Sequence, residues 1–355
     1  MIIGVCGFCS TGSSAVSDYL KEFDENQVLD MLEFTLTYLP DGLEDLEYHL
    51  TKKYSRGDDC YCAITRFRRY MDRYYINGGA KITKKNKKII KEITEKFLYD
   101  IVQLKWITNL RSELLLNDGL FYRYFGISIM KQRIIPFINK KLKRAVTLYP
   151  NHEVEVSIGP ANFDISSKKF VKEMLSCIGA NFSKNIVLDQ PFSGNDPEKS
   201  FHFFDDPRAI VVDRDPRDNY LFAKKMLYKK GRFMPIDKVE DFVKYYKLLR
   251  DNQPYKLPNK RILRIQFEDM VYNYEATTER IRQFCELPES RKKFTIFDPK
   301  ISMPNTQLFR RYPEYKKEIE YIEKNLTEYL FDFQKYPVPV IHGDMFIGKS
   351  PLDRK

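Results

Sequence analysis

The feature that most constrains the fold is the start of the chain, where a short apolar run, Ile2 to Cys6, leads into a loop bounded by two glycines. Beyond the loop, apolar residues recur at the spacing of one helix face; they are Val16, Tyr19, Leu20 and Phe23. A strand, a glycine-bounded loop and a helix begin a βαβ unit, and Gln27 to Leu32 is the expected second strand. The pattern therefore predicts an α/β fold.

The rest of the chain continues this alternation. We expect strands at 185–188, 209–212 and 262–267, and helices at 236–249, 275–284 and 315–331. Such alternation predicts a three-layer α/β/α fold with a mostly parallel sheet, and the glycine-bounded loop after the first strand makes the expected fold P-loop-like. Residues 43–150 are rich in Lys, Arg, Tyr and Leu and carry helical spacing. They are expected to form a helical insertion within a single domain spanning 1–355, and are a candidate acceptor-binding subdomain.

Composition excludes several classes of protein. No window approaches the ~20 apolar residues of a membrane span, and the N-terminus lacks a secretory signal, so we expect a cytoplasmic protein without a transmembrane segment. Six scattered cysteines predict no disulfide framework, and the four histidines form no paired ligand motif, so no metal site is expected. The net charge of +11 indicates either solvated helix faces or a surface that attracts an anionic ligand.

The loop Gly7 to Ser14 has the form G-x-x-x-x-G-S-S. Its glycines let successive N–H groups point inward, and a helix starting at Ser13 or Ser14 adds the positive end of its dipole. The loop therefore predicts a phosphate or sulfate site, with further donors from the hydroxyls of Ser10, Thr11, Ser13 and Ser14. An ordinary ATPase or GTPase is disfavoured, because Ser13 stands where such a loop has Lys. A Gly/Ser turn without a ligand is the alternative.

A second charged cluster follows the predicted strand 209–212. It reads Asp213-Arg214-Asp215-Pro216-Arg217-Asp218-Asn219. The carboxyl ends of strands are where open α/β sheets bind ligands, and Arg214 and Arg217 can each form forked hydrogen bonds to a phosphate. The alternative is an internal turn of Arg–Asp ion pairs.

Taken together, the two motifs resemble the carbohydrate-type sulfotransferases that use 3′-phosphoadenosine 5′-phosphosulfate (PAPS). The segment 266–271 with its following helix is similar to a further family motif, and residues 302–312 are more weakly similar to the loop that closes over the nucleotide. The resemblance implies that PAPS is the co-substrate, that no metal is required, and that Cys9 to Ser14 grip the 5′-phosphosulfate. It further implies that Arg214, with Arg217 and Asn219, holds the 3′-phosphate.

The chain departs from the family pattern at two positions. Ser10 stands where the family usually has Lys or Arg, so the cation that stabilises the leaving group is absent there. Arg310 and Arg311 are the candidates to replace it. Phe222 stands where the family usually has a Ser that assists 3′-phosphate binding, and Asn219 and Tyr220 are the candidates for that role.

The acceptor hydroxyl needs a general base, and the resemblance points to Glu33, after the second strand; His49 and His202 are the next candidates. The expected partner is a glycan or another hydroxyl acceptor, without nucleic acid, and peripheral membrane contact stays open. Two alternatives remain. One is a P-loop kinase or NTPase, because 185–189 and 209–213 resemble strands that end in a magnesium-binding Asp. The other is a non-catalytic nucleotide- or polyanion-binding protein, because Ser10 lacks charge.

Overall fold

The computed structural model describes residues 1–53, 57–76, 83–108, 134–142, 152–227, 234–251, 257–289 and 296–340. The chain divides into two compact units. One comprises residues 1–35 and 180–355 and is here called the sheet unit; the other comprises residues 36–179 and is called the helical unit. Residues 109–133 and 143–150 of the predicted insertion lie outside the described residues.

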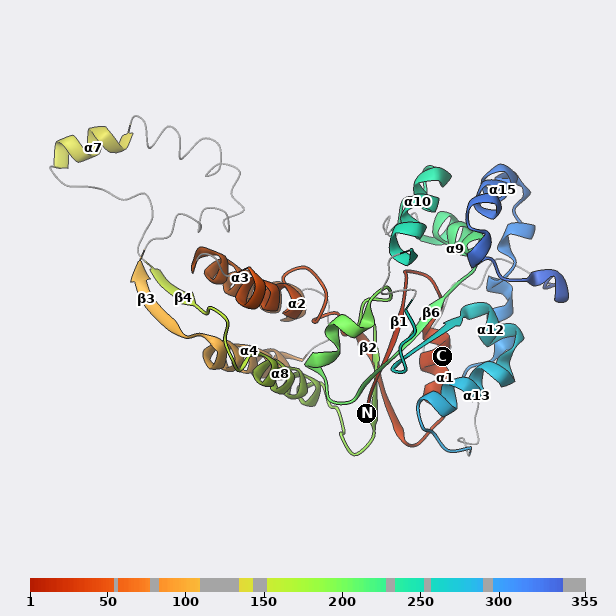
Figure 1. Ribbon diagram of the computed structural model, residues 1–355, viewed down its shortest axis with the longest axis horizontal. Coiled ribbons are helices and arrows are strands. Elements are labelled where there is room, and N and C mark those ends of the chain that lie inside the picture. The colour runs from red at the N-terminus through yellow and green to blue at the C-terminus, as the bar shows by residue number, and fades with distance from the viewer. Residues whose placement is uncertain are drawn as a thin grey trace. The chain divides into compact units, whose positions relative to one another are not determined.

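A five-stranded sheet organises the sheet unit (Figure 1). Its strands are β1 (Ile2–Gly7), β2 (Asn26–Glu33), β5 (Asn185–Asp189), β6 (Pro207–Asp213) and β7 (Ile262–Gln266), in the order β2-β5-β1-β6-β7. Every pairing is parallel, which confirms the predicted α/β class with a parallel sheet. The carboxyl ends of all five strands therefore meet at one edge of the sheet.

Helices α1 (Ser13–Leu20), α12 (Phe267–Tyr272) and α13 (Tyr274–Phe284) share one core with the sheet. Their buried residues, such as Val16 and Met270, pack with Ile3 and Val5 of β1. This core explains the spacing of the first apolar residues, because Val16, Tyr19, Leu20 and Phe23 are all buried in it.

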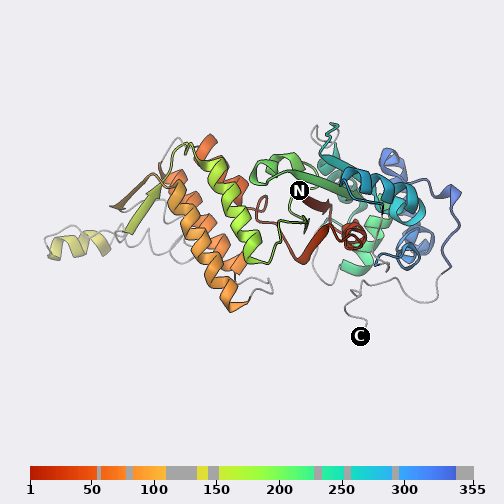
Figure 2. The ribbon, with the colours of Figure 1, turned by 90° about the horizontal axis from the view of Figure 1, so that it is seen from below.

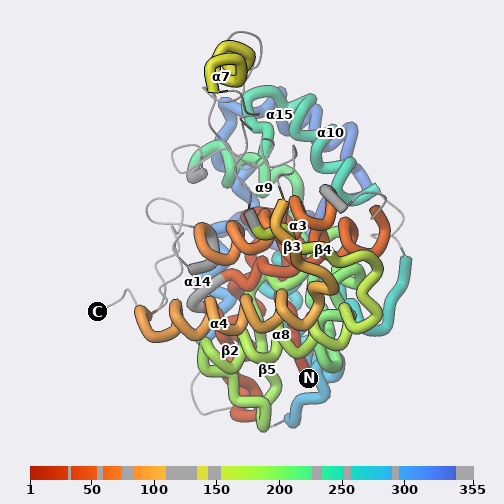
Figure 3. The backbone as a smooth tube through the Cα atoms, turned by 90° about the vertical axis from the view of Figure 1, so that its left-hand side faces the viewer, coloured from red at the N-terminus to blue at the C-terminus, as the bar shows by residue number. Residues whose placement is uncertain are grey.

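A second core joins α9 (Pro216–Phe222), α10 (Val239–Arg250) and α15 (Lys316–Asn325), which lie together in Figure 3. The predicted helix 315–331 is wrong at its end. The α-helix stops at Asn325, and Leu326 and Tyr329 reach the core from a short 3₁₀ turn, so the apolar spacing outlasts the helix. The other short helices of this unit are η5 (Pro197–Phe203), η6 (Ala223–Leu227), α14 (Pro299–Ser302), η7 (Met303–Asn305), η8 (Leu308–Arg310), η9 (Pro313–Tyr315), η10 (Thr327–Tyr329) and η11 (Phe333–Lys335).

The helical unit contains α2 (Leu43–Glu47), η1 (Tyr48–Lys52), α3 (Gly57–Arg69), η2 (Tyr70–Ile76), α4 (Lys84–Ile101), α7 (Ile135–Leu142) and α8 (Phe163–Cys177). Helices α4 and α8 lie side by side (Figure 2), with the rings of Phe97 and Phe170 stacked at 4.6 Å between centroids. An antiparallel pair, β3 (Leu104–Thr108) and β4 (His152–Val156), was not predicted from the sequence. Among the described residues, no helix combines the length and the apolar character needed to cross a bilayer.

Candidate active site

The loop between β1 and α1 lies at the carboxyl edge of the sheet, as predicted, and α1 begins at Ser13. Its backbone turns through left-handed conformations at Cys9 (φ 29°), Ser10 (φ 61°) and Gly12 (φ 86°). Within the described residues, no backbone or side-chain acceptor meets the N–H groups of Ser10, Thr11 or Ser13. Unpaired N–H groups that lie close together in a loop, at the start of a helix, form the kind of concavity that binds anions.

Side chains of the loop and of the neighbouring helices hold the loop in this conformation. The Thr11 hydroxyl is buried and accepts a hydrogen bond of 3.1 Å from the N–H of Phe8. A Cβ on Gly12 would lie 2.4 Å from the ring of Phe267, so only glycine fits under that ring. Asn219, on α9, donates a bond of 3.1 Å to the carbonyl oxygen of Cys9.

Gln190, which directly follows β5, reaches both ends of the loop. Its Oε1 accepts a hydrogen bond from the N–H of Gly7 at 3.2 Å, and its Nε2 donates to Oγ of Ser13 at 3.2 Å. Gln190 was not predicted from the sequence as a site residue. The available signal was its position after a predicted strand, at the edge where open α/β sheets bind ligands.

Arg214, after β6, connects the loop to the C-terminal part of the sheet unit. Its side chain is buried; Nη1 donates to the carbonyl oxygen of Ser10 at 3.0 Å, and Nη2 donates to the carbonyl oxygen of Asn305. The guanidinium lies between the rings of Phe222 and Phe267, at 4.9 and 5.3 Å from their centroids. Burial lowers the pKa of Arg214, and the nearby carboxyl groups of Asp218 and Glu268 oppose this.

The two charged residues of α9, Arg217 and Asp218, are both bonded to other parts of the sheet unit. Arg217 forms a two-pronged ion pair with Asp215, bonds to Glu323 at 2.9 Å and lies 4.0 Å from the centre of the Phe309 ring. The Asp218 carboxylate accepts bonds from the N–H groups of Gln307 (2.6 Å) and Leu308 (2.7 Å), which attaches the segment 303–311 to α9. Burial, followed by the charge of Asp215, raises the pKa of Asp218 to about 7.

Arg310 and Arg311 belong to that attached segment. Arg310 donates to Oε1 of Gln307 at 2.7 Å, and Arg311 donates to the carbonyl oxygen of Pro304. Burial lowers the pKa of Arg311, and among the described residues its Nε is a buried donor without an acceptor.

Two carboxylates meet at the same edge of the sheet. Glu33, exposed at the end of β2, pairs in register with Asp189 at the end of β5. Burial raises the pKa of Asp189 to about 7, and the charges of Glu33 and Asp30 act in the same direction. The structure thus places an exposed carboxylate and a second, easily protonated carboxyl group at the edge that carries the loop.

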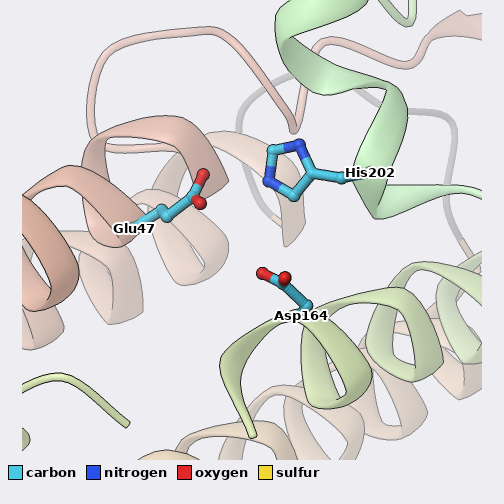
Figure 4. A group of neighbouring side chains, drawn as sticks. All are labelled: Glu47, Asp164 and His202. Carbon is cyan, nitrogen blue, oxygen red and sulfur yellow. The ribbon is translucent and has the colours of Figure 1, made fainter. Parts of the chain in front are cut away.

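The two candidate histidines belong to different units. His49 lies on η1 of the helical unit, and burial lowers its pKa. His202 lies on η5 of the sheet unit with its ring against that of Phe203. Figure 4 draws His202 with Glu47 of α2 and Asp164 of α8; because the last two belong to the helical unit, the three define no site within either unit.

This chain is an α/β protein with a parallel sheet. The first strand of that sheet leads into a loop of the kind that binds anions. The family model described as "Sulfotransferase family" matches residues 131–291, which confirms the predicted resemblance to sulfotransferases.

Two solved structures are similar over most of the chain. The sulfotransferase domain from the curacin biosynthetic pathway is 12% identical, with 93% of this chain and 98% of that chain covered and a TM-score of 0.39. Sulfotransferase STF9 from Mycobacterium avium is 13% identical, with 94% of this chain and 76% of that chain covered and a TM-score of 0.36. No curated protein matches the sequence.

Proposed function

We propose that this protein transfers a sulfuryl group from PAPS to a hydroxyl acceptor, and that the acceptor is a carbohydrate. The observation that carries the proposal is the loop 7–14, whose unpaired N–H groups lie at the start of α1 in a chain that matches the sulfotransferase family. PAPS supplies a sulfuryl group on a phosphate leaving group. The unpaired N–H groups and the hydroxyls of the loop suit its 5′-phosphosulfate.

The reaction is an in-line displacement in which the acceptor oxygen forms a bond to sulfur as the bond from sulfur to the bridging oxygen breaks. Negative charge develops mainly on the leaving phosphate, so the N–H groups of Ser10, Thr11 and Ser13 are proposed to contribute most there. The acceptor's proton passes to a base, and we assign that role to Glu33. Its exposed carboxylate lies at the same edge of the sheet as the loop.

The cation that Ser10 does not provide is assigned to Arg310 or Arg311. Arg311 is favoured, because its Nε has no acceptor among the described residues, whereas Arg310 is bonded to Gln307. Cys9 and Ser14 are proposed to contribute to donor binding only as members of the loop, without a separate role in the transfer. His49 and His202 remain secondary candidates for the base.

For the residues predicted to hold the 3′-phosphate, we propose roles that differ in detail from those predicted from the sequence. The guanidinium of Arg217 is bonded to Asp215 and Glu323, and both Nη atoms of Arg214 are bonded to backbone carbonyls, so that only the buried Nε of Arg214 has no acceptor among the described residues. We therefore propose that Arg214, Arg217 and Asn219 support donor binding by holding the loop and α9 in place.

The test is donor binding followed by transfer. Stabilisation by 3′,5′-adenosine bisphosphate without magnesium, together with transfer of labelled sulfate from PAPS to one of a panel of saccharides, is the expected result. A response only to ATP with magnesium would instead identify a kinase or NTPase. Binding of anionic polymers without transfer would identify a non-catalytic protein, and transfer to non-sugar hydroxyls alone would refute the carbohydrate assignment.

A further inference from the structure

The carboxamide of Gln190 joins the two ends of the loop through opposite atoms. Its Oε1 receives the N–H of Gly7, the last residue of β1, and its Nε2 reaches the hydroxyl of Ser13, the first residue of α1. The backbone of Gln190 is held in the left-handed region (φ 50°), and its own N–H donates to the carbonyl oxygen of Val5 at 2.9 Å. Such a conformation costs energy in a non-glycine residue and concentrates at functional sites.

The chemistry of the two partners determines which way the carboxamide faces. A backbone N–H is only a donor, so the group that meets Gly7 must be the carboxamide oxygen. The NH₂ group then faces Ser13, and because an amide NH₂ is only a donor, the Ser13 oxygen must accept this bond. A hydroxyl that accepts in this way keeps its own proton for another partner. No described residue accepts that proton.

We infer that Gln190 is a positioning residue that keeps the hydroxyl proton of Ser13 directed to the anion bound in the loop. Ser13 stands where nucleotide-binding loops of this form have Lys, so its hydroxyl is the donor that remains at that position. This inference rests on the proposed function, because the proposed anion is the phosphosulfate of the donor. It assigns a role to a residue from a different strand, 177 positions from Ser13.

The substitution Gln190→Glu tests this orientation directly, since it changes the NH₂ group to oxygen at nearly constant volume. One carboxylate oxygen can still accept from Gly7, but the other would accept from Ser13 and turn its proton away from the anion. We expect affinity for 3′,5′-adenosine bisphosphate to fall at least ~10-fold, while the melting temperature without ligand stays near that of the wild type. Unchanged affinity would overturn the inference.

A double-mutant cycle separates an effect through Ser13 from a general effect on the loop. We expect Gln190→Ala and Ser13→Ala each to weaken binding, and the double variant to bind as Ser13→Ala alone does. If the two losses simply multiply, Gln190 does not act through Ser13. If Gln190→Ala unfolds, the same cycle with Gln190→Met, which removes both polar atoms of the carboxamide without adding a charge, gives the answer.

Gln27→Glu is the matched control. Gln27 also accepts a backbone N–H, that of Asn181 at 2.6 Å, but it lies near the amino end of β2, away from the loop edge. This variant should bind 3′,5′-adenosine bisphosphate as tightly as the wild type. Equal losses of affinity in Gln27→Glu and Gln190→Glu would show a general effect of charge and contradict the inference.

Inorganic pyrophosphate serves as a second probe, so that failure of the inference is distinguishable from failure of the proposed function. If the wild type binds pyrophosphate but not the bisphosphate nucleotide, the proposed donor is wrong and the cycle is measured with pyrophosphate. If the wild type binds the nucleotide but the effects of the Gln190 and Ser13 substitutions are independent, the proposed donor is retained and the inference about Gln190 is refuted. If it binds neither, both are refuted.

Discussion

The guanidinium of Arg214 donates a hydrogen bond of 3.0 Å to the carbonyl oxygen of Ser10, across 204 positions of sequence. Ser10 has a left-handed backbone (φ 61°), and its carbonyl oxygen is the one that Arg214 holds. The same side chain holds the carbonyl of Asn305. One buried arginine therefore ties the loop after β1 to the segment that carries Arg310 and Arg311.

Replacing Arg214 should disturb the loop. We expect Arg214→Ala to lose at least ~10-fold in affinity for 3′,5′-adenosine bisphosphate, because a hydrogen bond from a charged donor contributes ~1.5–3 kcal/mol and each ~1.4 kcal/mol is tenfold in affinity. Titration calorimetry below the melting temperature of the variant measures this. Arg208→Ala, at the amino end of β6, is the control and should keep its affinity; unchanged binding in Arg214→Ala would remove Arg214 from the donor site.

Replacing Glu33 should affect transfer but not donor binding. General-base catalysis contributes roughly 10²–10⁴-fold, so Glu33→Gln is expected to lower the rate of labelled sulfate transfer about 100-fold or more. Affinity for the bisphosphate nucleotide should stay unchanged. Glu25→Gln, also at an exposed position and just before β2, controls for the loss of charge. Wild-type turnover in Glu33→Gln would show that another group takes the proton.

Gly12 should tolerate no side chain. Gly12→Ala combines a left-handed backbone with a Cβ 2.4 Å from the ring of Phe267, whereas Gly179→Ala has a similar backbone (φ 95°) and nothing within 4 Å. Both should lose ~1 kcal/mol or more to backbone strain, but only Gly12→Ala should also lose nucleotide binding. Chemical denaturation and calorimetry measure the two effects, and equal results for the two variants would contradict the role of the ring.

The raised pKa of Asp189 gives a dependence of stability on pH. Because the carboxyl titrates near 3.8 when unperturbed and at about 7 in the fold, the folded state binds the proton more tightly, and stability falls as pH rises from about 4 to about 7. Asn cannot ionise. The shift from 3.8 to about 7 corresponds to about 4 kcal/mol, so Asp189→Asn should melt roughly 8 °C or more above the wild type at pH 8 and near it at pH 4. A difference that does not change with pH would contradict the assigned pKa.

Local pattern was enough to predict the sheet. The strands at 185–188, 209–212 and 262–267 are confirmed within one or two residues. The first two are buried parallel strands, which are nearly continuous apolar runs, whereas the third is a partly buried edge strand. The pair β3 and β4 escaped prediction for the opposite reason. Most residues of β3 are exposed, so its sequence shows no alternation between a buried and an exposed face.

The loop could be predicted as a site, whereas the residues that hold it could not. Gly7 to Ser14 is a local pattern, and its helix begins where expected. The bonds from Gln190 and Arg214 exist only because β5 and β6 lie on either side of β1 in the folded sheet. Nothing in the sequence around Gln190 distinguishes it from another residue at the end of a strand.

The ring of Phe267 touches both Gly12 and the guanidinium of Arg214. A change in the volume of this single side chain would shift the turn of the loop and the arginine at the same time. Attempts to alter donor preference by redesign should therefore vary positions 12, 214 and 267 jointly. A change at one of these positions alone would leave the other two residues in the arrangement that fits the ring of Phe267.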